Sequence, residues 1–296
     1  MLLKNTEYQR LLNQKGYFTI PLLSKEAVKQ LLTVYETTPK QSGAFSASAH
    51  LKQIEIRKSI SRQIKQVIEP SIHELIQEKD VLGASFVVKA TGYNEVLQPH
   101  QDWNIVDEKK NRSYNIWIPL VDTSKDNGGI MVIPESHKWI DSIRHSSIPC
   151  AFNQVHNELF EIMTSLDIPA GHALIYDHAL LHASHANHTS TNRVAIAVGI
   201  KPKNADMRFY FNKGGKINEY EVNENYFLEE DIFNEPYNLI KISEIYYDFP
   251  LVNLDMLMSF TGIVFKEKEI ATKTPWFKIY TPMNIVREIR SRLKSE

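Results

Sequence analysis

The spacing of hydrophobic positions divides the chain into a helical beginning and a β-rich middle. Residues 5–15 have a helix-like pattern that Gly16 interrupts, and residues 17–20 are aromatic or β-branched, as in a short strand. Ser24 is a predicted N-cap, because a serine side chain accepts a hydrogen bond from a backbone N–H of the first helical turn. The helix that follows has Glu26 in its first turn and hydrophobic residues at helical spacing at Val28, Leu31, Leu32 and Tyr35.

The pattern changes at about residue 81. Before it, residues 38–49 predict a loop and residues 55–78 a second long helix. After it, short β-rich runs alternate with turn signals such as those at 126–129 and 169–171. The predicted strands are 84–90, 113–121, 129–134, 172–177 and 193–201.

Many short strands separated by turns are typical of a β-sandwich or barrel. We therefore predict a mainly β fold with surrounding helices, whose core is a double-stranded β-helix (a jelly roll of the cupin-like kind). Residues 1–296 are expected to form a single domain, with a helix-rich part at 1–80, the jelly-roll core at 81–212 and a C-terminal extension at 213–296. In the extension, the acidic and aromatic segment 219–236 is predicted to be a surface loop or lid.

The last residues, 283–296, have the pattern of a basic amphipathic helix, with Val286, Ile289 and Leu293 on one side. We expect this helix to dock on the sandwich rather than to bind a membrane or a partner.

Composition excludes several classes of protein. The net charge is −1, so no basic excess indicates nucleic acid as a partner. With Cys150 as its one cysteine, the chain forms neither an intramolecular disulfide nor a cysteine-rich zinc site. No stretch approaches the ~18 apolar residues of a membrane span, and the first residues lack a signal-peptide core, so we expect a cytoplasmic protein. Nothing in the pattern indicates an oligomeric state.

A His-x-Asp pair introduces candidate chemistry. On an extended strand, residues i and i+2 point to the same side, so His100 and Asp102 would present an imidazole and a carboxylate at one point. These are two of the three ligands of a 2-His-1-carboxylate iron site. By chance such a pair arises in roughly half of chains like this one, so alone it predicts no more than an ordinary surface pair.

A histidine-rich segment near residue 182 strengthens that interpretation. Arg193 opens an apolar strand, and a buried guanidinium is costly unless it binds an anion such as the distal carboxylate of 2-oxoglutarate. His178 and His182 have the i, i+4 spacing of a helical zinc site, but no glutamate follows His178 and the preceding run is strand-like. We predict that His185, His188 and His172 face solvent and that His137 has a structural role near the site.

Four stretches resemble the phytanoyl-CoA dioxygenase family of Fe(II)- and 2-oxoglutarate-dependent oxygenases. They are GYFTIPLLSKEAV at 16–28, LQPHQDW at 97–103, NIWIPLVDTSKDNGGIMVIPESHK at 115–138 and LLHASHANHTSTNR at 180–193, and the resemblance covers roughly residues 14–205. It implies that Fe(II) is held by His100, Asp102 and His182, that Arg193 with Ser184 binds the far carboxylate of 2-oxoglutarate, and that Gln101, Trp117 and Lys89 line the cosubstrate pocket.

The resemblance also implies a reaction in which O2 oxidises a C–H bond of a small molecule while 2-oxoglutarate becomes succinate and CO2. Halogenating relatives have a small residue at the position of Asp102, so hydroxylation is favoured here. Cyclisation, desaturation and epimerisation stay open, as do a cupin-like metal protein without 2-oxoglutarate and a non-catalytic binding protein.

The substrate is expected to be a small polar metabolite or a natural-product intermediate. An acyl-CoA thioester would need a basic patch for its phosphates, for which Lys109, Lys110 and Arg112 are the candidates. Selectivity is expected to lie in the loops 38–52, 103–112, 138–165 and 213–245.

Overall fold

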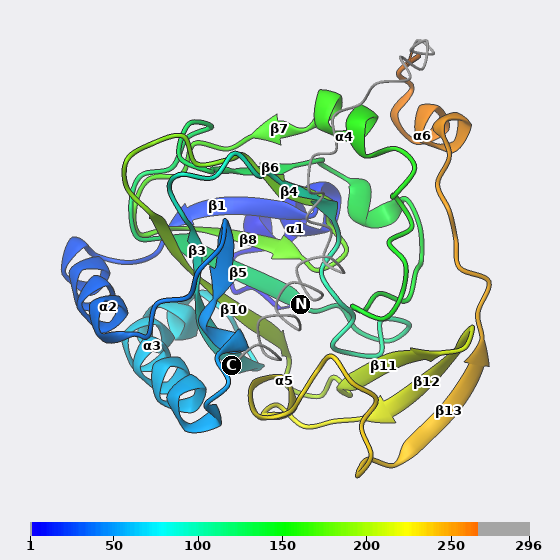
Figure 1. Cartoon of the computed structure of the whole chain (residues 1–296), viewed down its shortest axis with the longest axis horizontal. Coiled ribbons are helices and arrows are strands. Elements are labelled where there is room, and N and C mark those ends of the chain that lie inside the picture. The colour runs from blue at the N-terminus through cyan, green and yellow to red at the C-terminus, as the bar shows by residue number, and fades with distance from the viewer. Residues whose placement is uncertain (1, 266–296) are drawn as a thin grey trace.

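The computed structural model describes residues 2–265, and its centre is a jelly roll of two antiparallel sheets (Figure 1). One sheet has six strands in the order β1-β8-β5-β10-β3-β2, and the other has four in the order β4-β9-β6-β7. These strands are β1 (Tyr17–Pro21), β2 (Phe45–Ala47), β3 (Lys79–Lys89), β4 (Leu97–His100), β5 (Tyr114–Pro119), β6 (Ile130–Val132), β7 (Thr164–Ser165), β8 (His172–Asp177), β9 (His182–Ser184) and β10 (Arg193–Pro202).

The mainly β fold and all five strands predicted from hydrophobic runs are confirmed. β10 lies between β5 and β3 inside the six-stranded sheet, and its first four residues are buried. β3 alternates instead: Ala84, Phe86 and Val88 are buried, while Ser85 and Val87 between them are only half-buried. That alternation places one face of β3 against the helices and leaves the other face for the interior of the jelly roll.

The helices are α1 (Thr6–Lys15), α2 (Lys25–Thr37), α3 (Ile54–Leu75), α4 (His156–Ile162), α5 (Tyr226–Glu229) and α6 (Leu254–Thr261). α2 and α3 cover the outer face of the six-stranded sheet. The Ser24 side chain caps α2 by accepting a hydrogen bond from the Ala27 N–H at 3.2 Å, as predicted. Gly16 ends α1 in the left-handed region, where a Cβ atom would lie 2.5 Å from Nδ1 of His137. Only glycine fits this position without displacing His137.

Two predictions about elements were wrong. Part of the expected loop 38–49 is β2, an edge strand paired with β3, followed by the 3₁₀ helix Ser48–His50. The segment Phe45–Ala47 has little apolar pattern of its own, and its strand conformation comes from pairing with a distant partner. Segment 219–236 is not a loop throughout, since it begins in β12 and contains α5, and its role as a lid stays a prediction.

The extension forms a second, three-stranded sheet of β11 (Arg208–Lys213), β12 (Lys216–Glu221) and β13 (Lys241–Tyr246). Figure 1 shows it below the jelly roll. The expected boundaries of the core therefore differ from the sheets: β1 and β2 precede residue 81 but belong to the six-stranded sheet, whereas β11 pairs with β12. The predicted helix 283–296 lies outside the described residues, and a single domain for 1–296 stays a prediction. Among the described residues, no helix has the length and apolarity to cross a membrane.

Candidate metal centre

Two neighbouring strands bring two histidines and an aspartate together. His100 is the last residue of β4, His182 is the first residue of β9, and the two are direct partners in the ladder. Asp102 follows two residues after His100. One potential ligand atom from each of the three side chains lies within 4.8 Å of the others, and Nε2 of His182 is 3.6 Å from Oδ1 of Asp102. The structure therefore assembles the cluster that the sequence predicted.

Hydrogen bonds to the main chain orient both imidazoles. Nδ1 of His100 lies 2.7 Å from the carbonyl oxygen of Gln98, and Nδ1 of His182 lies 3.0 Å from that of Leu180. A ring whose Nδ1–H is bound in this way presents an unprotonated Nε2 to the centre of the cluster. Burial lowers the pKa of His100 to about 3, which also keeps its ring neutral. Two neutral imidazoles and a carboxylate are a donor set that fits a divalent iron ion.

Asp102 is held by three neighbours that sequence reasoning missed. Its Oδ2 accepts hydrogen bonds from the Tyr176 hydroxyl at 3.1 Å and from Nδ2 of Asn115 at 3.3 Å, while Nε of Arg144 donates to its backbone carbonyl at 2.8 Å. Burial would raise the pKa of Asp102, but the facing imidazole of His182 and the other histidines lower it to about 2. The carboxylate is therefore ionised, with Oδ1 directed at His182.

Two buried cations lie opposite each other in the six-stranded sheet. Arg193 and Lys89 are partners in the β10–β3 ladder and are 3% and 2% exposed. Nη1 of Arg193 donates to the Val87 carbonyl at 3.3 Å, and its Nε has no partner. Burial lowers the pKa of Arg193 to about 10, and burial together with the charge of Arg193 lowers that of Lys89 to about 7. Two adjacent buried cations are costly without an anion between them.

The remaining predicted pocket residues divide into two groups. The Trp117 ring lies 5.3 Å from the Arg193 guanidinium carbon, and Oγ of Ser184 is buried without a hydrogen-bond partner. Ser184 lies two residues after His182 on β9, so it shares a side of that strand with the candidate ligand. Gln101 has other contacts: Nε2 donates to the Ala179 carbonyl at 2.6 Å, and Oε1 accepts from the Ser142 hydroxyl at 3.4 Å. Its contacts do not connect it to Arg193.

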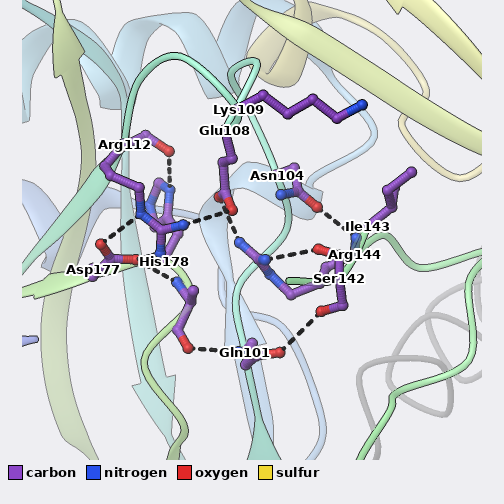
Figure 2. Close-up of polar contacts among 12 residues, drawn as sticks. Gln101, Asn104, Glu108, Lys109, Arg112, Ser142, Ile143, Arg144, Asp177 and His178 are labelled. Carbon is purple, nitrogen blue, oxygen red and sulfur yellow. Dashed lines mark hydrogen bonds and ion pairs between the residues drawn. The ribbon is translucent and has the colours of Figure 1, made fainter. Parts of the chain in front are cut away.

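A chain of ion pairs runs through the loops next to Gln101 (Figure 2). Asp177 binds Arg112 bidentately, Nη1 of Arg112 lies 3.2 Å from Glu108, and Glu108 lies 2.5 Å from Nη2 of Arg144. Arg144 then reaches the backbone of Asp102. The Glu108 side chain is 5% exposed, so both of its ion pairs are shielded from water. This network joins the loop that carries Asp102 to the end of β8, five residues before His182.

The other histidines are not part of this cluster, and several of them have contacts of their own. His178 is buried in a turn, not a helix, and Nδ1 of its ring lies 2.8 Å from the Ser113 hydroxyl. His188 is exposed, as predicted, but His185 is half-buried and its Nε2 lies 2.6 Å from Oγ of Ser165. His137 packs beneath Gly16 and contacts the Asn13 carbonyl, which fits a structural role.

A jelly roll that presents two imidazoles and one carboxylate at the paired ends of two strands defines a mononuclear, non-haem metal enzyme of the 2-His-1-carboxylate class. The family model of phytanoyl-CoA dioxygenase (PhyH) matches residues 12–195, which is more than half of the chain, and the chain belongs to this family. It is an Fe(II)- and 2-oxoglutarate-dependent dioxygenase. No curated protein sequence matches the chain.

Several solved structures are similar to this chain at low sequence identity. HygX from Streptomyces hygroscopicus, solved with nickel and 2-oxoglutarate bound, has a TM-score of 0.51 and 13% identity over 68% of this chain and 88% of its own. The non-haem α-ketoglutarate-dependent carbocyclase SnoK from nogalamycin biosynthesis has a TM-score of 0.48 and 19% identity over 69% and 86%. AviO1 from Streptomyces viridochromogenes Tue57 has a TM-score of 0.47 and 16% identity over 69% and 97%.

Proposed function

We propose that His100, Asp102 and His182 hold the Fe(II) of this dioxygenase and that Arg193, with Ser184, binds the distal carboxylate of 2-oxoglutarate. The observation that carries the proposal is the buried Arg193, whose Nε has no partner and whose ladder partner is another buried cation, Lys89. A dicarboxylate between them supplies the missing negative charge.

The protein groups have separable tasks around the metal. Iron with bound 2-oxoglutarate supplies the activation of O2 and the oxidative decarboxylation to succinate and CO2. Arg193 fixes the orientation of the cosubstrate, and the Trp117 ring limits the positions of that guanidinium. Tyr176 and Asn115 hold Oδ2 of Asp102, which leaves Oδ1 for the metal.

We further propose that the product is a hydroxylated small molecule. Asp102 occupies the carboxylate position, so this position is closed to a halide. Cyclisation, desaturation and epimerisation begin with oxidation of the same kind of C–H bond, and analysis of the product distinguishes them. A cupin-like protein without 2-oxoglutarate would need the histidines but not a buried Arg193, which makes it the weaker candidate.

The test is an anaerobic titration of the metal-free protein with Fe(II) and then 2-oxoglutarate, recorded in the visible range. The wild-type protein should develop the weak charge-transfer band of the chelate. Arg193→Ala should shift the half-saturating 2-oxoglutarate concentration upward by about tenfold or more, equivalent to ~1.4 kcal/mol, while the exposed Arg62→Ala control should not.

A second pair of variants tests the ligands themselves. His182→Ala should lose bound iron and the band, by more than the ~10–100-fold that loss of an outer hydrogen-bond partner costs, whereas the exposed His188→Ala should keep both. Iron binding without any band would favour the cupin-like protein. No iron binding would favour a non-catalytic binding protein.

A further inference from the structure

A cavity of about 330 Å³ lies beside the candidate metal centre. His100, Asp102 and Asn115 form part of its wall, so a molecule in the cavity has direct access to the metal. Arg193, Ser184 and Trp117 are not in its lining, so the cavity is distinct from the cosubstrate's carboxylate pocket. Its other walls come from β2 and the 3₁₀ helix Ser48–His50, from β3 and β10, and from the segment that contains α5.

Small residues on two paired strands create this space. Gly83 and Ser85 on β3, and Ala197 and Gly199 on β10, line the cavity and are half-buried, while their neighbours along each strand are buried. Ser85 and Ala197 are direct ladder partners, so the smallest side chains meet across the two strands. A larger residue at any of these positions would extend into the volume that a substrate needs.

The cavity is predominantly apolar. The side chains that give it this character are Phe45, Leu82, Val87, Leu97, Trp103, Ile105, Phe227, Leu228, Ile232 and Phe233. Asp102 is the single carboxylate among its described lining residues, which include no lysine or arginine. His50 also lines it, and burial with the nearby Arg57 charge lowers the pKa of that ring to about 4, so it is neutral. A charged substrate group would therefore be desolvated here without a counter-ion.

Acidic residues lie next to the cavity in the described part of the chain, which disfavours a phosphate group there. Between Leu228 and Ile232, two residues of the lining, the chain carries Glu229, Glu230 and Asp231. The nearby cations lie close to these carboxylates. Lys58 pairs with Glu229 at 3.3 Å. Arg57 donates to the backbone carbonyls of Ala49 and Glu229, its Nε has no hydrogen-bond partner, and its guanidinium is within the electrostatic influence of Asp231, Glu230 and Glu229.

Two of the three sequence-based candidates for a phosphate patch, Lys110 and Arg112, are also neutralised. Nζ of Lys110 lies 3.2 Å from Asp107 and 3.6 Å from Asp206. Arg112 binds Asp177 and Glu108 in the network of Figure 2, in which Lys109 extends away from the other residues. Lys109 is exposed and has no carboxylate partner within residues 2–265, so a coenzyme A headgroup with several phosphates would meet this single free cation among carboxylates.

We infer that the substrate is an uncharged, largely apolar molecule that enters this cavity without a coenzyme A headgroup, an inference that rests on the proposed function. The apolar cavity walls favour an apolar molecule of matching shape, and polar lining residues lie at the candidate metal centre. Of the two kinds of substrate expected from the sequence, this differs from the small polar metabolite and is compatible with a natural-product intermediate.

The experiment measures displacement of a neutral fluorescent probe, N-phenyl-1-naphthylamine, from the protein loaded anaerobically with Fe(II) and 2-oxoglutarate. The competitors are 1-decanol, decanoate and decanoyl-CoA, which share one alkyl chain and differ in charge. Decanol should displace the probe at concentrations about tenfold or more below those of decanoate and decanoyl-CoA. Equal or stronger displacement by decanoyl-CoA would overturn the inference.

Variants locate the probe in the cavity. Ser85→Leu with Ala197→Leu should weaken probe binding by about tenfold or more, while the exposed Thr33→Leu on α2 should leave it unchanged. The two single variants serve if the double variant does not fold. Unchanged probe binding in folded cavity variants would contradict the inference.

A third variant tests the charge of the rim. Glu230→Lys should improve displacement of the probe by decanoyl-CoA, because it replaces a negative charge near the cavity with a positive one, and leave displacement by decanol unchanged. The improvement should be only about threefold, because the side chain is exposed and its charge is screened by salt. The Fe(II)–2-oxoglutarate band is recorded on every sample. Its absence from the wild type would reject the proposed function, whereas a present band with the wrong order of competitors would reject the substrate class alone.

Discussion

Lys89 is an unusual residue, since it is a lysine that lies 2% exposed opposite a second cation. Burial, followed by the charge of Arg193, lowers its pKa to about 7, while Glu95 acts weakly in the other direction. A carboxylate bound nearby would favour the charged ammonium and raise that pKa again. Binding of 2-oxoglutarate and protonation of Lys89 are therefore linked.

The linkage predicts proton uptake on cosubstrate binding. At pH 8 unliganded Lys89 is mostly neutral, so binding should take up most of one proton, whereas at pH 6 it is already charged and uptake should vanish. Calorimetry of 2-oxoglutarate binding to the Mn(II)-loaded protein, in two buffers of different ionisation enthalpy, measures this directly. Lys89→Met should abolish the buffer dependence at pH 8. Identical heats in both buffers for the wild type would show that Lys89 does not respond to the ligand.

At the scale of elements, the ion-pair network in Figure 2 connects loops that are not joined by strand pairing. Asp102 follows the end of β4, and Glu108 lies between two arginines from different loops. Removing the charge of Glu108 leaves the 8%-exposed Arg144 side chain without its carboxylate. The loop that positions Asp102 would then lose its main support.

Glu108→Gln should therefore destabilise the fold by about 3 kcal/mol, measured by urea unfolding. It should also weaken iron binding, because Arg144 donates to the Asp102 carbonyl. Glu55→Gln is the matched control, since Glu55 is 84% exposed and its pairing with Lys58 is fully solvated. Equal unfolding curves for the two variants would show that the buried network adds no stability.

Some helices and strands could be predicted from the sequence and others could not. β10 and β5 have long apolar runs, and the signals of α2 are all local, so their sequences alone identify them. β2 and β9 are three residues each. β2 adopts strand conformation through a partner at least 40 positions away, and β9 pairs with β4 more than 80 positions away. No local pattern encodes such pairing.

Within the site, the candidate metal ligands could be predicted from the sequence, but the residues that hold them could not. His100 and Asp102 stood out because their residue types and spacing match two ligands of the set, and His182 stood out through the family resemblance. Asn115, Tyr176 and Arg144 did not, because each acts through Asp102 rather than on the metal. The one available signal was Asn115, a polar residue two positions before Trp117 on a buried strand and therefore on the same side of it.

At the scale of the whole molecule, the first 50 residues are part of the core rather than an addition to it. β1 closes one edge of the six-stranded sheet beside β8, and β2 closes the other edge beside β3. Tyr17 pairs with Tyr176, so the N-terminal strand supports the side chain that holds Asp102. The helix-rich beginning and the metal centre therefore depend on each other.

The pairing of His100 with His182 has one more consequence. An ion shared by Asp102 and His182 would join positions that are 80 residues apart in the chain, and so act as a removable cross-link. An ion that binds only the folded chain, at ~100 times its dissociation constant, stabilises that state by about 2.7 kcal/mol and should raise the melting temperature by about 5 °C or more. His182→Ala should show no such rise, which calorimetric scans with and without Mn(II) would reveal. The stability of the folded protein would then depend on the metal concentration around it, independently of any substrate.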